Sequence, residues 1–361
     1  MDGILMKTKR VLGLDLGSTA FKMALLEVQD GRPALVQARL LEIPPQAGEE
    51  VRLGALNSLL EGVDLAHLSQ VASVTDDSFA CVRVVVIPPM PEAERGDAVK
   101  WELQRFLAVP PEQVAVDCKL LGEEESGGSR KQQLLTVALP AAAVREQLAF
   151  LSKAGVRPTH LIPKTEALNA WLGPASREAA AILEVGGGCC ELIVAENGQA
   201  VFARKIAGGA ATLTKEMTGV LMTDQGQVSL TEGEAETVKR SVGIPQGDAA
   251  GLGVQGVSGI QIFSLIRGSL ERLAVEAERS LAFYSESGGR ASIGEVILVG
   301  GGAHLKGLAE WLQERLGIRV VQPKVFENLH VAPGALQGAA ASTELGFAAA
   351  LGAALGAGKG I

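Results

Sequence analysis

Short apolar runs separated by tight turns open the chain. Residues 11–16, 21–28 and 35–43 are each dominated by Val, Leu and other apolar side chains, and an Asp-Gly pair at 30–31 lies between the last two runs. Such runs predict strands, and an Asp-Gly pair between two of them predicts a hairpin. The first run carries one carboxylate, Asp15, and a buried carboxylate is costly unless it is paired or holds a cation. We therefore expect Asp15 either to serve a ligand or to cap the loop that follows it.

A second copy of this pattern begins near residue 181. An apolar run that carries Glu184 leads into a glycine-rich turn, and an Asn-Gly pair at 197–198 follows where the first copy has Asp-Gly. The matching turn residues are Gly17, Ser18 and Thr19 in the first copy and Gly186, Gly187 and Gly188 in the second. Glycine lets the backbone approach a ligand closely and aim successive N–H groups at an anion. The duplication predicts a phosphate cradle with a hydrated Mg2+ beside Asp15.

A third glycine turn and several amphipathic segments complete the pattern. Gly300, Gly301 and Gly302 follow an apolar run at 293–299, which predicts a strand-to-helix turn. Helices are expected at 50–61, 92–107, 141–154, 164–172, 213–220, 232–242, 261–287 and 306–316, with most of 211–288 helical. Further strands are expected at 71–75, 79–87, 114–120, 134–139 and 319–321. The apolar tail at 345–361 is interrupted by glycines and short for a membrane span, so we expect a helix that docks on the body.

Composition narrows the function classes. The 361 residues include 44 glycines and 47% hydrophobic but only 4% aromatic residues, which fits an aliphatic α/β protein of two or more domains. The formal net charge of −8 argues against a nucleic-acid partner, since phosphate backbones attract basic surfaces. The four cysteines show no CxxC spacing and no signal peptide precedes them, so we expect reduced thiols in the cytoplasm.

Five stretches carry a resemblance that covers nearly the whole chain. They are GLDLGSTAFK at 13–22, IPPMPEAERGDAVKWELQRFLAVPPEQV at 87–114, AETVKRSVG at 235–243, ERSLAFY at 278–284 and ILVGGGAHLKGLAEWLQERLGIRV at 297–320. Two phosphate loops followed by a GGG adenosine loop resemble the actin-like ATPase superfamily. More narrowly, the chain resembles the FtsA/PilM branch, and most of all the type IV pilus assembly proteins of the PilM family.

The resemblance implies a fold and a domain division. The implied fold is α/β, with duplicated actin-like (ribonuclease H-like) domains that face a nucleotide cleft and an FtsA-type inserted α+β subdomain. The first domain would comprise 1–87 and 162–178, with the tail at 343–361 docked on it. The inserted subdomain would be 88–161. The second domain would comprise 179–207 and 293–342, and residues 208–292 would form a helical lobe that caps the nucleotide.

The resemblance also implies ATP and Mg2+ as ligands. Asp15 would hold the metal through water, the two turns would bind phosphates, and the glycines at 300–302 would pass against the adenosine. Lys22 either reaches a phosphate or is simply solvated. Glu236 and Lys239 either approach the ribose and base or form a surface ion pair.

Two acids match positions with a catalytic role in the family. Glu166 would position the attacking water, although a glutamate is also favoured at a helix N-terminus for its charge alone. Glu184 stands where the family carries Asp, and its extra methylene would disturb the octahedral geometry that Mg2+ requires. Nucleotide binding is therefore better supported than hydrolysis.

By the same resemblance, the expected function is an ATP-binding cytoplasmic scaffold of the pilus inner-membrane assembly complex. It would hold the N-terminal cytoplasmic peptide of a PilN-like membrane protein between the inserted subdomain and the first domain, where a strand edge could accept it by β-addition. A small-metabolite kinase of the superfamily is the alternative, but no sugar-binding stretch is evident. An FtsA-like division protein would need a basic amphipathic C-terminal helix, and 348–361 offers only Lys359.

Overall fold

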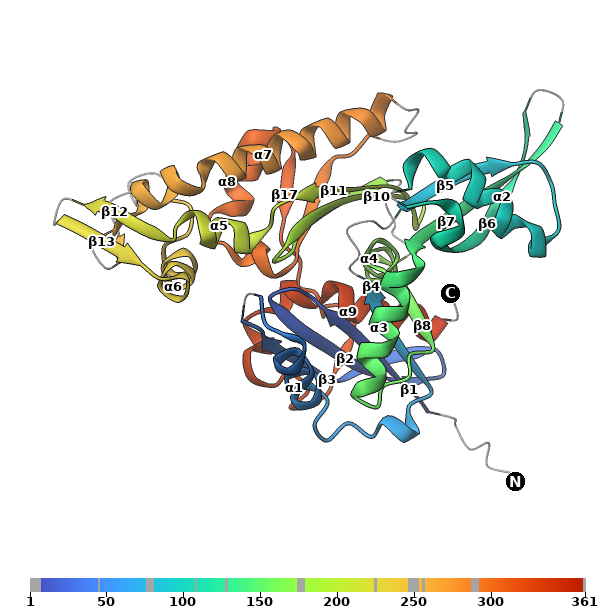
Figure 1. Ribbon diagram of the computed structural model, residues 1–361, viewed down its shortest axis with the longest axis horizontal. Coiled ribbons are helices and arrows are strands. Elements are labelled where there is room, and N and C mark those ends of the chain that lie inside the picture. The colour runs from blue at the N-terminus through green and yellow to red at the C-terminus, as the bar shows by residue number, and fades with distance from the viewer. Residues whose placement is uncertain are drawn as a thin grey trace.

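Two central sheets form the body of the protein, with a smaller sheet and a helical lobe projecting from them (Figure 1). The computed structural model describes residues 8–44, 46–75, 81–107, 109–126, 129–173, 179–223, 226–245, 253–254, 257–286 and 292–359. The expected start of a strand at Phe79 and the expected end of a helix at Ser287 lie outside these residues.

The first central sheet has six strands in the order β18-β3-β2-β1-β4-β8. Their bounds are β1 (Lys9–Leu16), β2 (Ala20–Gln29), β3 (Arg32–Glu42), β4 (Gln70–Thr75), β8 (His160–Pro163) and β18 (His330–Val331). β1 runs antiparallel to β2 and parallel to β4. Both faces are covered by helices, which explains why its strands are apolar on both sides.

One face of this sheet packs against α1 (Glu49–Leu59) and α3 (Ala141–Lys153). Leu12, Leu14 and Phe21 of the hairpin join residues of both helices in one buried cluster. The opposite face packs against α4 (Lys164–Leu172) and α9 (Ala348–Lys359). The hairpin that carries Asp15 is therefore held rigidly between two helical layers.

The C-terminal helix α9 packs unusually close to β1 and α4 (Figure 1). A Cβ atom added to Gly13 would lie 2.0 Å from the Ala350 carbonyl oxygen, and one added to Gly352 would lie 1.8 Å from the Ala167 carbonyl oxygen. Glycine is required at both positions because the backbones nearly touch. Among the described residues, no helix combines the length and apolar character needed to cross a membrane.

The second central sheet repeats the connectivity of the first. Its order is β11-β10-β9-β16-β17, and β9 runs antiparallel to β10 and parallel to β16. The bounds are β9 (Ala179–Val185), β10 (Cys189–Glu196), β11 (Gln199–Ala207), β16 (Glu295–Val299) and β17 (Arg319–Val321). β9 takes the place of β1, so Glu184 and the glycine turn after it stand where Asp15 and its turn stand in the first sheet. The duplication predicted from sequence is confirmed at the level of topology.

A three-stranded sheet of order β5-β7-β6 lies apart from the central sheets, at the upper right of Figure 1. It consists of β5 (Cys81–Ile87), β6 (Val114–Ser126) and β7 (Ser129–Pro140), and it packs against α2 (Glu92–Leu103) around its own small core. Its surface keeps large apolar side chains, since Trp101 is 68% exposed and Phe106 is 41% exposed.

The helical lobe contains α5 (Ala210–Glu216), α6 (Glu232–Val242) and α7 (Gly259–Glu286), whereas α8 (Leu308–Leu316) connects β16 to β17 of the second central sheet. The expected helix at 213–220 is wrong beyond Glu216, because β12 (Gly219–Thr223) and β13 (Gly226–Leu230) form a hairpin there. Gly219 and Gly226 adopt φ angles of +118° and +116°, which favour glycine and break the helix. Short elements are β14 (Gly253–Val254), β15 (Val257–Ser258) and 3₁₀ turns at Leu65–His67, Gln104–Phe106, Pro111–Gln113, Gly301–His304, Gly338–Ala341 and Glu344–Phe347.

Candidate functional site

Asp15 and Lys22 face each other across the β1–β2 hairpin. They are register partners, and Lys22 Nζ lies 2.9 Å from Asp15 Oδ2. The lysine side chain is only 11% exposed, so it is not simply solvated. Burial alone would raise the pKa of Asp15, but the charges of Lys22 and Lys164 outweigh it and hold that pKa below its ordinary value. Asp15 is therefore ionised, and within the described part of the chain its Oδ1 has no hydrogen-bond partner.

The turn after β1 lies directly against the turn after β9. A Cβ atom added to Gly187 would lie 2.2 Å from Thr19 Oγ1, and one added to Gly188 would lie 3.1 Å from Ser18 Oγ. On the other side of the first turn, a Cβ atom on Gly17 would lie 3.7 Å from Lys22 Nζ. The two turns, which are more than 160 positions apart in the sequence, thus converge on one place with the Lys22 ammonium group.

The second turn is fixed from behind by the start of α5. The carbonyl oxygens of Gly186 and Gly187 accept hydrogen bonds of 2.9 Å from the backbone N–H groups of Ala210 and Ala211. Gly209 makes this possible, because a Cβ atom there would lie 2.5 Å from the Gly186 carbonyl oxygen. Sequence reasoning did not single out Gly209. The feature of the sequence that could have indicated Gly209 is the Gly208-Gly209 pair, which directly follows the run at 199–207.

The three glycines at 300–302 have different structural roles. Gly300 has a φ of +96°, and a Cβ atom on it would lie 2.5 Å from the Val185 carbonyl oxygen. Gly302 is also needed for packing, since its Cβ atom would lie 2.5 Å from Val185 Cγ1. Gly301 is exposed and has nothing within 4 Å of the place where a Cβ would sit. The fold therefore demands glycine at Gly300 and Gly302, whereas none of the described neighbours demands it at Gly301.

Gly346 joins the third turn to the first. A Cβ atom on it would lie 3.5 Å from Lys22 Cε and 3.8 Å from Gly301 Cα. The Gly300 N–H donates to the neighbouring Leu345 carbonyl oxygen over 2.8 Å. The start of the C-terminal segment is therefore part of the site. Sequence reasoning missed Gly346, because only its distant neighbours in space distinguish it from other glycines of the tail.

Glu184, the counterpart of Asp15 in β9, is buried and pairs with a lysine. Its Oε2 atom lies 3.7 Å from the Nζ atom of Lys164, the first residue of α4. The carboxylate oxygens also lie close beneath the second turn, since a Cβ on Gly186 would be 3.3 Å from each of them. Lys164 was not singled out from the sequence, where it reads as an ordinary helix-start residue.

Glu166 lies in the first turn of α4, as Lys164 does, but its neighbours differ from those of Lys164. Burial raises the pKa of its carboxyl group, and the charge of Lys119 in β6 opposes that shift. Its Oε1 atom is buried and without a hydrogen-bond partner among the described residues. Electrostatically, Glu166 is thus coupled to the three-stranded sheet. Its role in positioning a water stays a prediction.

Glu236 and Lys239 form a buried anchor for α6. Lys239 Nζ donates to Glu236 Oε2 over 2.6 Å, to Thr214 Oγ1 over 2.7 Å and to the Ala210 carbonyl oxygen over 3.0 Å. Although burial opposes it, hydrogen bonding to Lys239 and Thr214 lowers the pKa of Glu236 to about 2. The pair is more than a surface ion pair, because it ties α6 to the same α5 segment that supports the second turn.

The donors around these turns fit a nucleotide phosphate better than a directly ligated metal. Glycine turns and the Lys22 ammonium group are suited to phosphate oxygens. In the described ranges, no group of three His, Cys, Asp or Glu side chains is placed to hold a metal ion. The oxygen that remains for a hydrated Mg2+ is Asp15 Oδ1, which can accept a hydrogen bond from metal-bound water.

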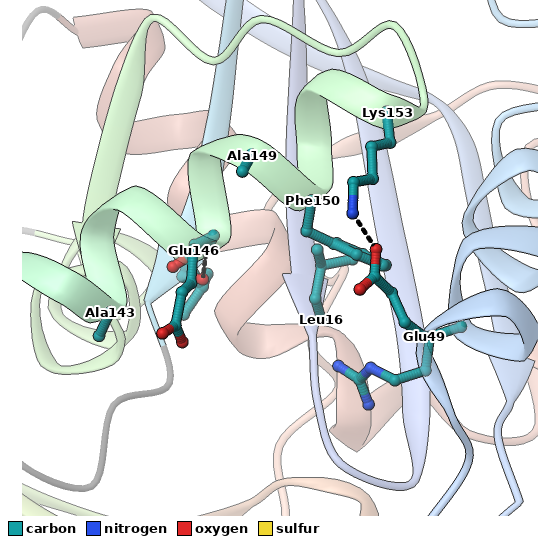
Figure 2. Close-up of a pocket in the computed structure, with 10 residues that line it drawn as sticks. Leu16, Glu49, Ala143, Glu146, Ala149, Phe150 and Lys153 are labelled. Carbon is teal, nitrogen blue, oxygen red and sulfur yellow. Dashed lines mark hydrogen bonds and ion pairs between the residues drawn. The ribbon is translucent and has the colours of Figure 1, made fainter.

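A groove of about 650 Å³ lies beside the turns, between α1 and α3 on the first sheet (Figure 2). Its lining residues are Leu16, Glu49, Arg52, Val74, Ala143, Glu146, Gln147, Ala149, Phe150 and Lys153. Glu49 of α1 and Lys153 of α3 form an ion pair across one end (Figure 2). Gln147 Nε2 donates to Ser73 Oγ over 2.9 Å and to the Val74 carbonyl oxygen over 2.8 Å, which fixes α3 on β4.

Arg52 is the notable polar group in this groove. Its guanidinium carbon lies 4.8 Å from the Phe21 ring centroid and 6.0 Å from that of Phe150. Among the described residues it contacts these rings and no carboxylate, and burial lowers the pKa of the guanidinium. Its N–H groups are thus available for a bound carbonyl or carboxylate. The groove also includes Leu16, which directly follows Asp15, so the groove and the turns share the end of β1.

Comparison with known proteins identifies the fold. The profile of the family described as type IV pilus assembly protein PilM matches residues 13–357. A chain of a solved PilM–PilN type IV pilus biogenesis complex is 26% identical, covers 96% of this chain and 97% of its own length, and superimposes with a TM-score of 0.75. The ethanolamine utilization protein EutJ from Carboxydothermus hydrogenoformans is 16% identical over 97% of this chain and 89% of its own, with a TM-score of 0.52. The expected actin-like fold is confirmed.

Proposed function

Because this chain belongs to the type IV pilus assembly protein PilM family, we propose that it is a nucleotide-binding scaffold of the pilus machine. In this role it holds the N-terminal cytoplasmic tail of a PilN-like membrane protein. A protein of similar fold has been solved as a PilM–PilN complex, which supports a partner of this kind. Family membership favours the scaffold over a small-metabolite kinase.

The proposed nucleotide is ATP. The turns at 17–19 and 186–188 and the Lys22 ammonium group bind its phosphates, and Gly301 lies against the adenosine. Glu236 and Lys239 position the capping lobe over the ribose and base. The observation that supports this best is the open space at Gly301, between two glycines whose absent side chains the fold itself requires.

Mg2+ enters this proposal only with the nucleotide. It would be held through water at Asp15 Oδ1, and it would supply charge neutralisation to the phosphates. Turnover is expected to be slow or absent, because Glu184 is longer than the family's Asp and is engaged by Lys164. Glu166 is the proposed water-positioning acid.

The tail of the partner would occupy the groove between α1 and α3. The groove combines apolar walls with charged side chains at its ends, which suits an extended peptide with alternating apolar anchors. β-Addition is not available at this place, because the bordering strands β1 and β4 are both interior strands of the first sheet. Side-chain contacts and the Arg52 guanidinium group would therefore hold the tail.

We keep the domain division that the resemblance implies, except that residues 81–87 form β5 of the three-stranded sheet and are therefore assigned to the inserted subdomain. The first sheet and α9 would move as one domain, the second sheet as another, with the three-stranded sheet as the inserted subdomain and 208–292 as the cap. Nucleotide and tail would then be coupled, because the end of β1 supplies both Asp15 and Leu16.

Calorimetric titration of ATP in Mg2+ buffer tests the nucleotide half of the proposal. We expect saturable binding of one nucleotide per chain, weakened at least about tenfold by Lys22→Met, as for the loss of one buried charge contact to phosphate. Lys9→Met, at the exposed start of the same hairpin, is the matched control and should bind like the parent. Absence of binding heat in the folded parent protein would overturn the assignment.

A further inference from the structure

Lys164 is a buried lysine inside the candidate nucleotide site. The residue is only 6% exposed, and it begins α4, which packs against α9. Its position is therefore set by the core of the protein and not by solvent. A buried ammonium group is costly unless it is paired, so this lysine needs a physical explanation.

The charge of Lys164 acts on both carboxylates of the site. Its Nζ atom lies 3.7 Å from Glu184 Oε2, beneath the second turn. Its charge also contributes to the lowered pKa of Asp15, on the opposite side of the touching turns. The charge of Lys164 thus acts on both Asp15 and Glu184, whereas the ion pair of Lys22 is with Asp15.

The site therefore carries cations of its own. Three buried carboxylates, Asp15, Glu184 and Glu191, the register partner of Glu184 on β10, are offset by two ammonium groups, Lys22 and Lys164. Without Lys164, the formal charge of these side chains would change from −1 to −2, and the site would repel a nucleotide phosphate more strongly unless a divalent cation came with it. Lys164 thus halves the net negative charge of the site.

A purely structural role explains this arrangement less well. Buried ion pairs seldom add stability over apolar residues of similar size, because desolvation offsets their attraction. An apolar pair at Lys164 and Glu184 would serve packing equally well. The pair lies directly below Gly186, in the turn that the proposed phosphates approach.

We propose that Lys164 is a built-in counter-cation that makes nucleotide binding at this site largely independent of Mg2+. This inference rests on the proposed nucleotide function. Lys164 supplies, from within the protein, much of the positive charge that a divalent cation would otherwise bring to the two acids. The protein then binds ATP even where free Mg2+ is scarce, and ATP remains bound without a metal arranged for hydrolysis.

The test is the ratio of ATP dissociation constants measured in EDTA and in excess Mg2+, by calorimetry on the full chain. For the parent protein, we expect the ratio to stay below about tenfold. Lys164→Met makes the site more negative by one unit charge and should raise the ratio by about tenfold or more, in line with the loss of one unit charge at a buried site. Glu184→Gln removes one negative charge and should lower the ratio.

Two further variants distinguish an effect of charge on the ratio from an effect of misfolding. The double variant with Lys164→Met and Glu184→Gln restores the formal charge of the parent site, so its ratio should return to that of the parent. It also remains informative if Lys164→Met alone does not fold, because no buried charge is left unpaired. Lys324→Met replaces an exposed lysine outside the site and should leave the ratio unchanged.

The outcomes distinguish this inference from the function on which it rests. If the parent protein fails to bind ATP even with Mg2+, the nucleotide proposal itself is wrong. If the parent binds ATP with Mg2+ but loses more than about tenfold in affinity in EDTA, or if the ratio is the same in all folded variants, the role of Lys164 is wrong and nucleotide binding stands.

Discussion

Arg240 of α6 and Glu42 of β3 form an ion pair with an N–O distance of 2.7 Å, and this pair links the helical lobe to the first central sheet. Arg240 also holds Glu236, the partner of Lys239, over 2.7 Å. One side chain therefore connects the buried anchor of α6 to the opposite side of the candidate nucleotide site. We interpret the Arg240–Glu42 pair as a latch that favours the closed arrangement.

Breaking this latch should speed nucleotide release. Glu42→Gln removes the carboxylate of an exposed pair, and such pairs contribute about 1 kcal/mol or less, so ATP dissociation should accelerate about two- to fivefold. Stopped-flow displacement of a fluorescent ATP analogue measures the rate. Glu27→Gln, which breaks the exposed Arg10–Glu27 pair in the same sheet, is the control and should leave the rate unchanged. Equal rates in all three proteins would contradict the latch.

Asp15→Asn should remove the effect of Mg2+ on ATP binding without weakening metal-free binding, because it removes one negative charge from the site. The amide keeps the shape of the side chain but provides a much poorer acceptor for metal-bound water than the Asp15 Oδ1 oxygen. ATP titrations of the parent and the variant, each with Mg2+ and with EDTA, give the four dissociation constants needed. If Mg2+ tightens ATP binding equally in both proteins, Asp15 is not the metal-facing acid.

Gly301 and Gly300 should respond in opposite ways to a side chain. Gly301→Val meets open space in the protein, so its free energy of unfolding should change by no more than about 0.5 kcal/mol. Its ATP affinity should nevertheless fall at least tenfold, because the new side chain fills the space proposed for adenosine. Gly300→Ala combines a φ of +96° with contact to Val185, and should destabilise the fold by about 1–3 kcal/mol. Normal ATP affinity in folded Gly301→Val would rule out the adenosine assignment.

Arg52→Ala should weaken capture of a PilN-like tail without unfolding the protein. The guanidinium group lies near the rings of the buried Phe21 and of Phe150, which lines the groove, so its loss removes both hydrogen-bond donors and a packing surface for the peptide. We expect at least about a tenfold loss of affinity in peptide titrations, as is typical for an arginine at the centre of an interface. Arg145→Ala changes an exposed arginine of α3 outside the groove lining and should have no effect. Equal losses in both variants would indicate a general charge effect.

Glu236 should contribute stability that depends on acid pH. Its pKa in the folded protein is lowered to about 2, below the ordinary glutamate value. Its contribution is therefore fully present above the ordinary pKa of about 4.5 and is lost as the pH falls from there toward 2. Urea unfolding of the parent and Glu236→Gln from pH 6 to pH 3 should show a stability difference that shrinks with acidity. A difference that is constant over this range would mean that the Glu236 pKa is not lowered.

The sequence was sufficient for the features that local pattern encodes. Asp15 and Glu184 each precede a glycine turn at the end of an apolar run, so the duplicated halves and the meeting of their turns could be predicted. The helix at 213–220 was predicted too long, because amphipathic spacing outweighed Gly219, whose positive φ starts a hairpin.

Features that depend on long-range packing could not be predicted. The partner of Arg240 lies 198 positions away, and nothing near either residue in the sequence indicates the pair. Lys164 and Gly346 belong to the site only because α4 and the C-terminal segment fold against β1 and β2. Their roles follow from burial and proximity, which a single sequence does not contain.

The central claim is that this protein holds the tail of a PilN-like protein and that ATP strengthens the hold. Fluorescence anisotropy of a labelled N-terminal peptide from such a partner, titrated with the full chain in the presence and absence of ATP and Mg2+, tests it most directly. We predict saturable binding in both conditions and at least several-fold tighter binding with nucleotide, since coupling between two sites is typically about 1–3 kcal/mol. No binding in either condition would contradict the account, and binding that is indifferent to nucleotide would contradict the coupling.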